Sequence, residues 1–331
     1  MSYASLPFAV DPSLAGGPDF AALALGLVGV PPAVGAIVAV LTALVTARAA
    51  IAWTQLTWLP GLSPVPLQQL TATRRRAGLL ASGAMVVLLL AGDTRTPQLP
   101  PQPLLLPLAM AHAMLAGCLA AMVATDWDSY LIPDVIPLVG GVMGLTLSLV
   151  LGPLAPVPLW ENWLPLDPAV AVPVRPAWIA AHPRWHAAAV SLAGAVAGLV
   201  SVLALRAVAS RVLGVEAMGS GDATLMAMAG AYVGWQAVLL ALLLAPVLGL
   251  VGGLLVATTT GRPFIAFGPW LAAATWLLLC LWRRLWSPTA RTLPDLFSDV
   301  PVLLGTIACV LGGTAALLLL MRRRDAPAER H

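Results

Sequence analysis

The chain has 331 residues, of which 60% are hydrophobic and 9% are charged, with a formal net charge of +3. Soluble domains carry roughly 25% charged residues, so this composition excludes an ordinary water-soluble protein. The basic residues lie singly or in short groups, which gives no sign of a nucleic-acid-binding surface.

Long apolar runs predict membrane-spanning helices, because a helix needs roughly 20 apolar residues to cross a bilayer and lipid cannot satisfy free backbone groups. The short alternating segments of a membrane β-barrel do not occur. The predicted fold is therefore all-α, a polytopic transmembrane bundle of about 8–9 spans. We expect these spans near 20–47, 77–92, 104–125, 131–152, 187–207, 223–235, 236–258, 265–282 and 301–321, with Pro31 and Pro32 kinking the first.

Three regions follow from this pattern. Residues 1–103 form an N-terminal membrane region with two spans and a cytoplasmic loop, and residues 104–282 form a membrane core. Residues 283–331 hold the last span and a basic cytoplasmic tail. Within the core, 153–186 contains eight prolines and several tryptophans, which predicts an irregular extracytoplasmic loop at the membrane surface.

Arginines suggest the orientation, because positive charges gather on the cytoplasmic side. Arg48 and Arg74–Arg76 flank the first connection, and Arg206 and Arg211 follow the fifth span. Placing these inside puts the segments around 126 and 222 at the cytoplasmic boundary of a bacterial inner membrane. Arg184 and several other arginines then fall outside, so the rule favours this orientation without deciding it.

Acidic residues are scarce and gather in two segments, TDWDSYLIPDVIP with Asp126, Asp128 and Asp134, and VEAMGSGDATLMAMAG with Asp222. Ionisable groups in membrane helices are costly and usually mark a functional site. The alternative is that these acids only cap helices, with Asp222 as an N-cap and Asp134 after Pro133 near a helix start. Two clusters on one face of the membrane favour the functional interpretation.

Gly219 and Gly221 directly precede Asp222 in a Gly-Ser-Gly-Asp sequence. Glycine lets another chain approach closely, so an extended substrate could lie beside the acid. The GxGD pattern is short and by itself unspecific.

Two longer stretches carry a resemblance. They resemble the two acid-bearing segments of type IV prepilin peptidases, the GxGD class of membrane aspartic peptidases. The two stretches are ATDWDSYLIPDVIPLVGGVMGL and GSGDATLMAMAGAYVGWQAVLLALLLAPVLGLVGGL. RPFIAFGPWLAAA adds a weaker match to the family's Pro-Phe-Gly-Pro-Phe region. The resemblance implies that Asp126 and Asp222 are the catalytic pair, with Asp134, Asp128, Pro133, Gly219 and Gly221 as supporting residues.

The chemistry suits this pair, because metal-free peptide hydrolysis needs one carboxylate to activate water and one carboxylic acid to protonate the carbonyl oxygen. Two neighbouring carboxyl groups share a proton and titrate as a unit, as in soluble aspartic proteases, from which we borrow the pattern. The expected substrates are prepilins or pseudopilins with a basic leader. We expect no cofactor and no metal.

The chain departs from the family at two places. The 49–76 loop lacks the two Cys-x-x-Cys pairs of the bifunctional members, so N-methylation is not expected and the peptidase-only branch is the better comparison. Thr224 stands where family members often carry Lys.

Two other functions stay open at this point. A non-catalytic homologue could act in pilus or secretion assembly, although both acids are retained. A proton-coupled transporter would also hold acids in the membrane, but such carriers show internal repeats that this chain does not display. His112, in the middle of a span, is expected to be an interior histidine.

Overall fold

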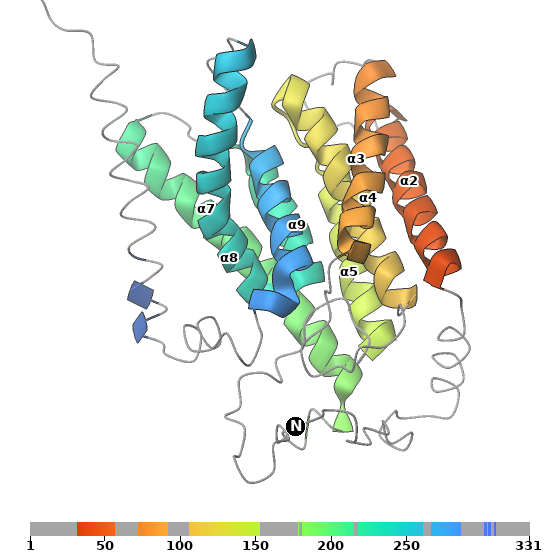
Figure 1. Ribbon diagram of the computed structural model, residues 1–331. Coiled ribbons are helices and arrows are strands. Elements are labelled where there is room, and N and C mark those ends of the chain that lie inside the picture. Colours follow the sequence, from red (N-terminus) through yellow and green to blue (C-terminus); the bar gives the residue numbers. More distant parts are fainter. Residues whose placement is uncertain are drawn as a thin grey trace, which may run out of the picture.

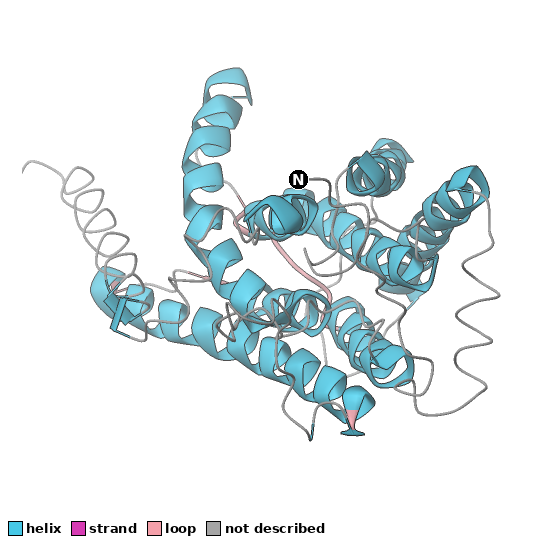
Figure 2. Cartoon of the chain, turned by 60° about the horizontal axis from the view of Figure 1, so that its bottom comes forward, coloured by secondary structure: helices cyan, strands magenta, loops and turns pink. Residues whose placement is uncertain are grey.

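A computed structural model of the chain describes residues 32–56, 72–91, 106–152, 181–214, 218–260 and 266–285, together with Trp178 and a few residues between 301 and 308. The described part is helical throughout and contains no strand, as Figure 2 shows. Its seven helices are α2 (Pro32–Leu56), α3 (Ala72–Ala91), α4 (Leu106–Ser129), α5 (Val135–Leu151), α7 (Pro183–Leu213), α8 (Ser220–Thr260) and α9 (Gly268–Leu285). The predicted all-α membrane fold is confirmed.

Four of these helices are long and apolar enough to cross a membrane, within Ala33–Ala52, Pro107–Trp127, Pro183–Arg211 and Ser220–Gly252. α5 and α9 contain shorter apolar helices, Val135–Leu151 and Gly268–Trp282. The described residues therefore show a multi-span membrane protein, and the predicted number of 8–9 spans goes beyond what they establish. The last expected span, 301–321, lies almost entirely outside the described residues.

One predicted boundary differs from the structure, and another lies at the edge of the described residues. The described helix α2 begins at Pro32, a position that suits a residue whose missing N–H is not needed in the first turn, and the expected kink at Pro31 and Pro32 falls partly outside the described residues. α7 begins at Pro183, so the end of the expected surface loop 153–186 is already helical. Residues 153–177, with most of the loop, lie outside the described part.

The helices pack in two groups joined through α5 and α9 (Figure 1). α2, α3 and α4 contact one another, and α7, α8 and α9 form the second group around α8. α5 packs on α7 and α8, and α4 contacts α5 and α9. The buried interior between them holds large side chains such as Leu115, Met122, Met226, Tyr232 and Leu271.

α7 and α8 cross closely because glycines face each other. A Cβ added at Gly194 would collide with the backbone of Gly230, and one added at Gly198 would collide with the Met226 carbonyl. Gly194 and Gly198 are four residues apart, the small-xxx-small spacing that lets membrane helices approach. Ser191 Oγ donates a hydrogen bond of 2.7 Å to the Ala231 carbonyl across the same interface.

α8 is interrupted at Gly234, where φ is 79° and ψ is 169°. Only glycine adopts this backbone conformation readily. The interruption lies next to the predicted boundary between the apolar runs 223–235 and 236–258, but Ser220–Gly252 forms a single candidate membrane span, so the prediction of two separate spans here is not established.

Candidate active site

Asp126 lies on the last turn of α4 and is only 6% exposed. The helix ends just beyond it, where Tyr130 takes a positive φ of 54° and its N–H donates to the Asp126 carbonyl at 3.0 Å. A left-handed residue at this place is a common way to end a helix. The acid is thus held at the end of a buried membrane helix, where the chain turns toward α5.

Asp222 is the third residue of α8 and is 7% exposed. The helix begins at Ser220, so the alternative in which Asp222 is the N-cap is wrong, and Gly219 occupies that position. The Gly219 N–H donates a hydrogen bond to the Asp222 carboxyl, the backward contact that an acidic residue in the first turn makes in a capping box. This contact fixes the carboxyl at the start of α8.

Ile132, in the connection between α4 and α5, lies where three segments meet. A Cβ added at Gly221 would lie 2.8 Å from the Ile132 Cβ, so the start of α8 presses against this residue. A Cβ added at Gly268, the first residue of α9, would lie 3.1 Å from the Ile132 Cδ1. Side chains at either glycine would therefore push the segments apart.

Gly268 also touches the acid itself. Its N–H donates a hydrogen bond to the Asp126 carboxyl, and a Cβ at this position would collide with Oδ2 of the same group. The start of α9 therefore lies directly against Asp126.

The fold brings the two acids, 96 positions apart in sequence (222 minus 126), into one site. The two carboxyl groups lie near enough for the charge of Asp126 to act on Asp222. Oδ2 of Asp126 is buried and has no hydrogen-bond partner among the described residues. A buried carboxyl oxygen usually has a partner, and an unpaired one beside a second acid is suited to bind water or a substrate group.

The supporting residues lie around this pair in different ways. Pro133 is buried, and Asp134 is exposed at the N-cap of α5 without a side-chain capping hydrogen bond. Gly219 is exposed, and Asp128 is on the last turn of α4 with its side chain outside the described set. Thr224, at the place of the family lysine, donates from Oγ1 to the Gly221 carbonyl at 3.0 Å, within its own helix turn.

Two other expectations concern metals and His112. The described residues contain no group of three or more His, Cys, Asp or Glu that could hold a metal ion. His112 is buried in α4, as expected of an interior histidine. Most of the 49–76 loop lies outside the described residues.

Sequence reasoning missed the roles of Ile132 and Gly268. Both lie in stretches that carried the resemblance, since Gly268 belongs to RPFIAFGPWLAAA, but no pattern in the sequence showed that they meet at Asp126. That contact arises only when α9 packs beside α4.

Two buried acids lie near each other at the ends of helices that can cross a membrane. The chain is therefore a polytopic membrane protein with a buried two-carboxyl site. Residues 113–254, which include both acids, match the model of the type IV leader peptidase family. The Gly268 contact lies beyond the matched region.

Curated relatives agree with this family. The chain is 32% identical over 177 residues to a prepilin leader peptidase/N-methyltransferase of Pseudomonas putida, covering 53% of this chain and 50% of the relative. Proteins of the same description match from Aeromonas salmonicida (32% over 179 residues; 52% and 49%) and Stutzerimonas stutzeri (42% over 96 residues; 28% and 32%). The chain thus spans about half the length of the longer-matching relatives. No solved structure is similar to it at a significant level.

Proposed function

We propose that this protein is an intramembrane aspartic endopeptidase that removes the basic leader from prepilin or pseudopilin substrates. The observation that carries the proposal is the presence of two buried acids, Asp126 and Asp222, near enough to influence each other electrostatically, inside the region that matches the leader peptidase family. The names of the relatives supply the substrate class.

In this mechanism one carboxylate takes a proton from water as the water oxygen attacks the scissile carbonyl carbon. The other, protonated carboxyl group donates its proton to the carbonyl oxygen. As the tetrahedral intermediate collapses, the C–N bond breaks and the carboxyl that took the proton from water gives it to the leaving nitrogen. The intermediate's hydroxyl returns its proton to the other carboxylate, which restores the starting pair. A pair that shares one proton can do both tasks, which a single acid cannot.

The proposal includes the 8–9 spans and the cytoplasmic position of the site in a bacterial inner membrane. It also includes the division into regions 1–103, 104–282 and 283–331.

The distribution of arginines supports the orientation. A Cβ at Gly78 would lie 3.2 Å from that of Ala124, so Arg74–Arg76 at the start of α3 lie at the same end of the bundle as Asp126. Arg211 lies in the last turn of α7. Positive charge near the acids is what a cytoplasmic face predicts.

The test is leader cleavage in a membrane containing the full chain and a candidate prepilin from the same genome. Asp126→Asn and Asp222→Asn should each reduce cleavage by about 10³-fold or more, since each removes one of two essential proton-transfer groups. Asp134→Asn should reduce cleavage far less, because its side chain is exposed at the start of α5 and makes no capping hydrogen bond.

The variant proteins must be present in the membrane at wild-type amounts. Substantial cleavage by both single variants would exclude this acid pair as the catalytic one. A wild-type protein that cleaves none of the prepilins of its genome would favour a non-catalytic role in assembly.

A further inference from the structure

The first turn of α9 is anchored on α8 by a tryptophan. Trp270 is the third residue of α9, two positions after Gly268, whose N–H donates to the Asp126 carboxyl. Its indole lies across a glycine notch on α8, formed by Gly249 and Gly252. A Cβ added at Gly252 would collide with the six-membered ring of Trp270, and one added at Gly249 would lie 3.5 Å from the Trp270 Cγ and Cδ1. Residues three apart are neighbours on one helix face, so the indole occupies the space of two absent side chains.

The bend in α8 allows this contact. In a straight helix with a rise of 1.5 Å per residue, positions 222 and 252 would be about 45 Å apart. α8 is interrupted at Gly234, and this bend lets the later part of α8 reach the first turn of α9, while the first turn of α8 carries Asp222. The Trp270 contact therefore ties the later part of α8 to the turn that touches Asp126.

The first turn of α9 links the position of the indole to that of Gly268. The Trp270 N–H donates to the Phe267 carbonyl at 3.0 Å, which closes the turn. Pro269 lies between Gly268 and Trp270, and its fixed φ makes the link rigid. The N–H groups of a first helical turn have no partner inside the helix, and that of Gly268 is directed to Asp126. A shift of the indole would thus move this N–H away from the carboxyl.

We propose that Trp270 is a positioning residue for peptide hydrolysis: held in the glycine notch, it keeps the Gly268 N–H against the Asp126 carboxyl. The inference rests on the proposed function, because leader cleavage is the reaction that it affects. Trp270 acts through Gly268, so its loss should slow the chemical step and leave substrate binding nearly unchanged.

Steady-state cleavage of a prepilin by the full chain in membranes tests this role, with rates expressed per folded chain. Trp270→Ala empties the notch and should lower kcat about 10- to 100-fold, with KM changed less than about threefold, because a misplaced catalytic group slows the reaction without weakening binding. Trp270→Phe keeps a ring in the notch. Since the indole N–H has no hydrogen-bond partner among the described residues, this variant should retain most of the wild-type kcat.

An exchange of size between the two partners gives a sharper test. Gly252→Ala alone should displace the indole and lower kcat by a similar factor, since its Cβ would overlap the ring. Phenylalanine lacks the outer ring atoms that this Cβ would meet. Trp270→Phe in the Gly252→Ala background should therefore restore part of the lost kcat, which general destabilisation by two substitutions would not do.

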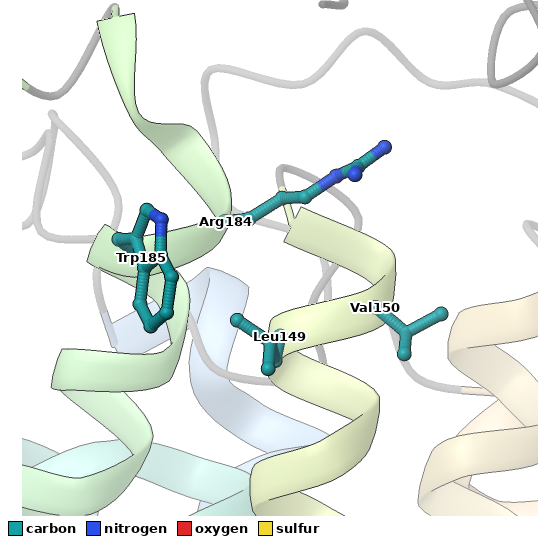
Figure 3. A pocket seen from close by; sticks show the side chains of 4 residues that line it. All are labelled: Leu149, Val150, Arg184 and Trp185. Carbon is teal, nitrogen blue, oxygen red and sulfur yellow. The ribbon is translucent and has the colours of Figure 1, made fainter.

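Trp185→Ala is the matched control and should leave kcat and KM unchanged. It removes a tryptophan that is 66% exposed, from a surface pocket at the start of α7 whose other lining residues are Leu149, Val150 and Arg184 (Figure 3). None of these residues belongs to the candidate active site.

Three results would overturn the positioning role: a wild-type kcat per folded chain in Trp270→Ala, a loss confined to KM, or a Gly252→Ala defect that Trp270→Phe does not relieve. Each of them leaves the proposed function intact, because wild type still cleaves. A wild-type chain that cleaves no prepilin would refute the proposed function and this role together.

Discussion

Gly221 and Gly268 each leave room for a neighbour that forms part of the candidate site. At Gly221 the neighbour is Ile132, and at Gly268 it is both Ile132 and the Asp126 carboxyl. At Gly221 the contact is with the Ile132 Cβ, which no side-chain rotation can move away. At Gly268 the contacts are with the ends of the Asp126 and Ile132 side chains, so a side chain there would turn the carboxyl itself out of place. The positions of the two acids therefore depend on residues that carry no chemistry themselves.

Gly221→Ala tests this dependence. The added Cβ would lie 2.8 Å from the Ile132 Cβ, so the start of α8 must move away from the connection between α4 and α5. Asp222 is the next residue and would move with it. A displacement of about 1 Å at a catalytic group can cost roughly 10²-fold in rate, and we expect a loss of that size in leader cleavage.

Gly219→Ala is the matched comparison, because its added Cβ would meet nothing closer than 3.8 Å. This variant should lose much less activity than Gly221→Ala, even though both glycines belong to the same GxGD pattern. Ile132→Gly, combined with Gly221→Ala, should restore part of the lost rate. Equal losses in the two single variants would show that the contact with Ile132 does not position the acid.

The sequence predicted the acids of the candidate site but not the residues that pack against them. The two acids and their pairing followed from scarcity and resemblance, because a charged residue in an apolar chain is conspicuous. The contact of Gly268 with Asp126 could not be predicted, since a glycine gives no local signal of what packs against it.

Among the helices, the crossing of α7 and α8 has the closest backbone approach, with Gly194 against Gly230 and Gly198 against Met226. Membrane helices gain little from the hydrophobic effect on association, so close packing and hydrogen bonds such as Ser191 to Ala231 hold them together. α8 carries Asp222, so this crossing also supports the site.

Gly230→Ala should destabilise the protein. Its Cβ would overlap the Gly194 carbonyl, and overpacking of this kind costs about 1–3 kcal/mol. The measurement is the midpoint of thermal unfolding of the detergent-solubilised chain.

Gly83→Ala in α3 is the control, because its Cβ would meet only the Leu44 Cδ2 at 3.9 Å. Replacing an uncrowded helical glycine should leave stability unchanged or raise it by about 0.5–1 kcal/mol. A midpoint for Gly230→Ala as high as that of Gly83→Ala would contradict the close crossing.

Helix positions were predicted well because apolar runs and helix breakers are local features. The break between 235 and 236 was visible as two apolar runs, and the structure places it at Gly234. The start of α7 was predicted too late because Pro183 was counted with the prolines of a loop. A proline in the first turn of a helix is well tolerated, and only the packed helix distinguishes the two cases.

At the scale of the whole molecule, the acids and the start of α7 lie far apart. Asp126 lies at the same end of the bundle as the start of α3 with Arg74–Arg76. α7 has 31 residues and is about 46 Å long, more than a bilayer core. The two ends of α7 are therefore expected to lie on opposite sides of the membrane.

Cysteine labelling along α7 tests this arrangement. His182→Cys, at the exposed start of α7, should react with a membrane-impermeant maleimide in spheroplasts, and Arg211→Cys should react only after the membrane is opened. Both positions are exposed, so their difference reports sidedness rather than burial. Labelling measured in the unsubstituted chain gives the background from the native cysteines. The reverse pattern would place the acids outside, and labelling of both from one side would contradict the span.

By itself, the sequence determined that this protein is a helical membrane protein and that Asp126 and Asp222 are its outstanding pair of acids. Composition, apolar run length and the cost of burying charge are properties of short stretches, and they can be evaluated without knowing the fold. The nearness of the two acids and the packing of Gly221 and Gly268 around Ile132 were decided only by the tertiary structure. Each depends on which helices lie side by side, and glycine contacts across helices leave almost no trace in the local sequence.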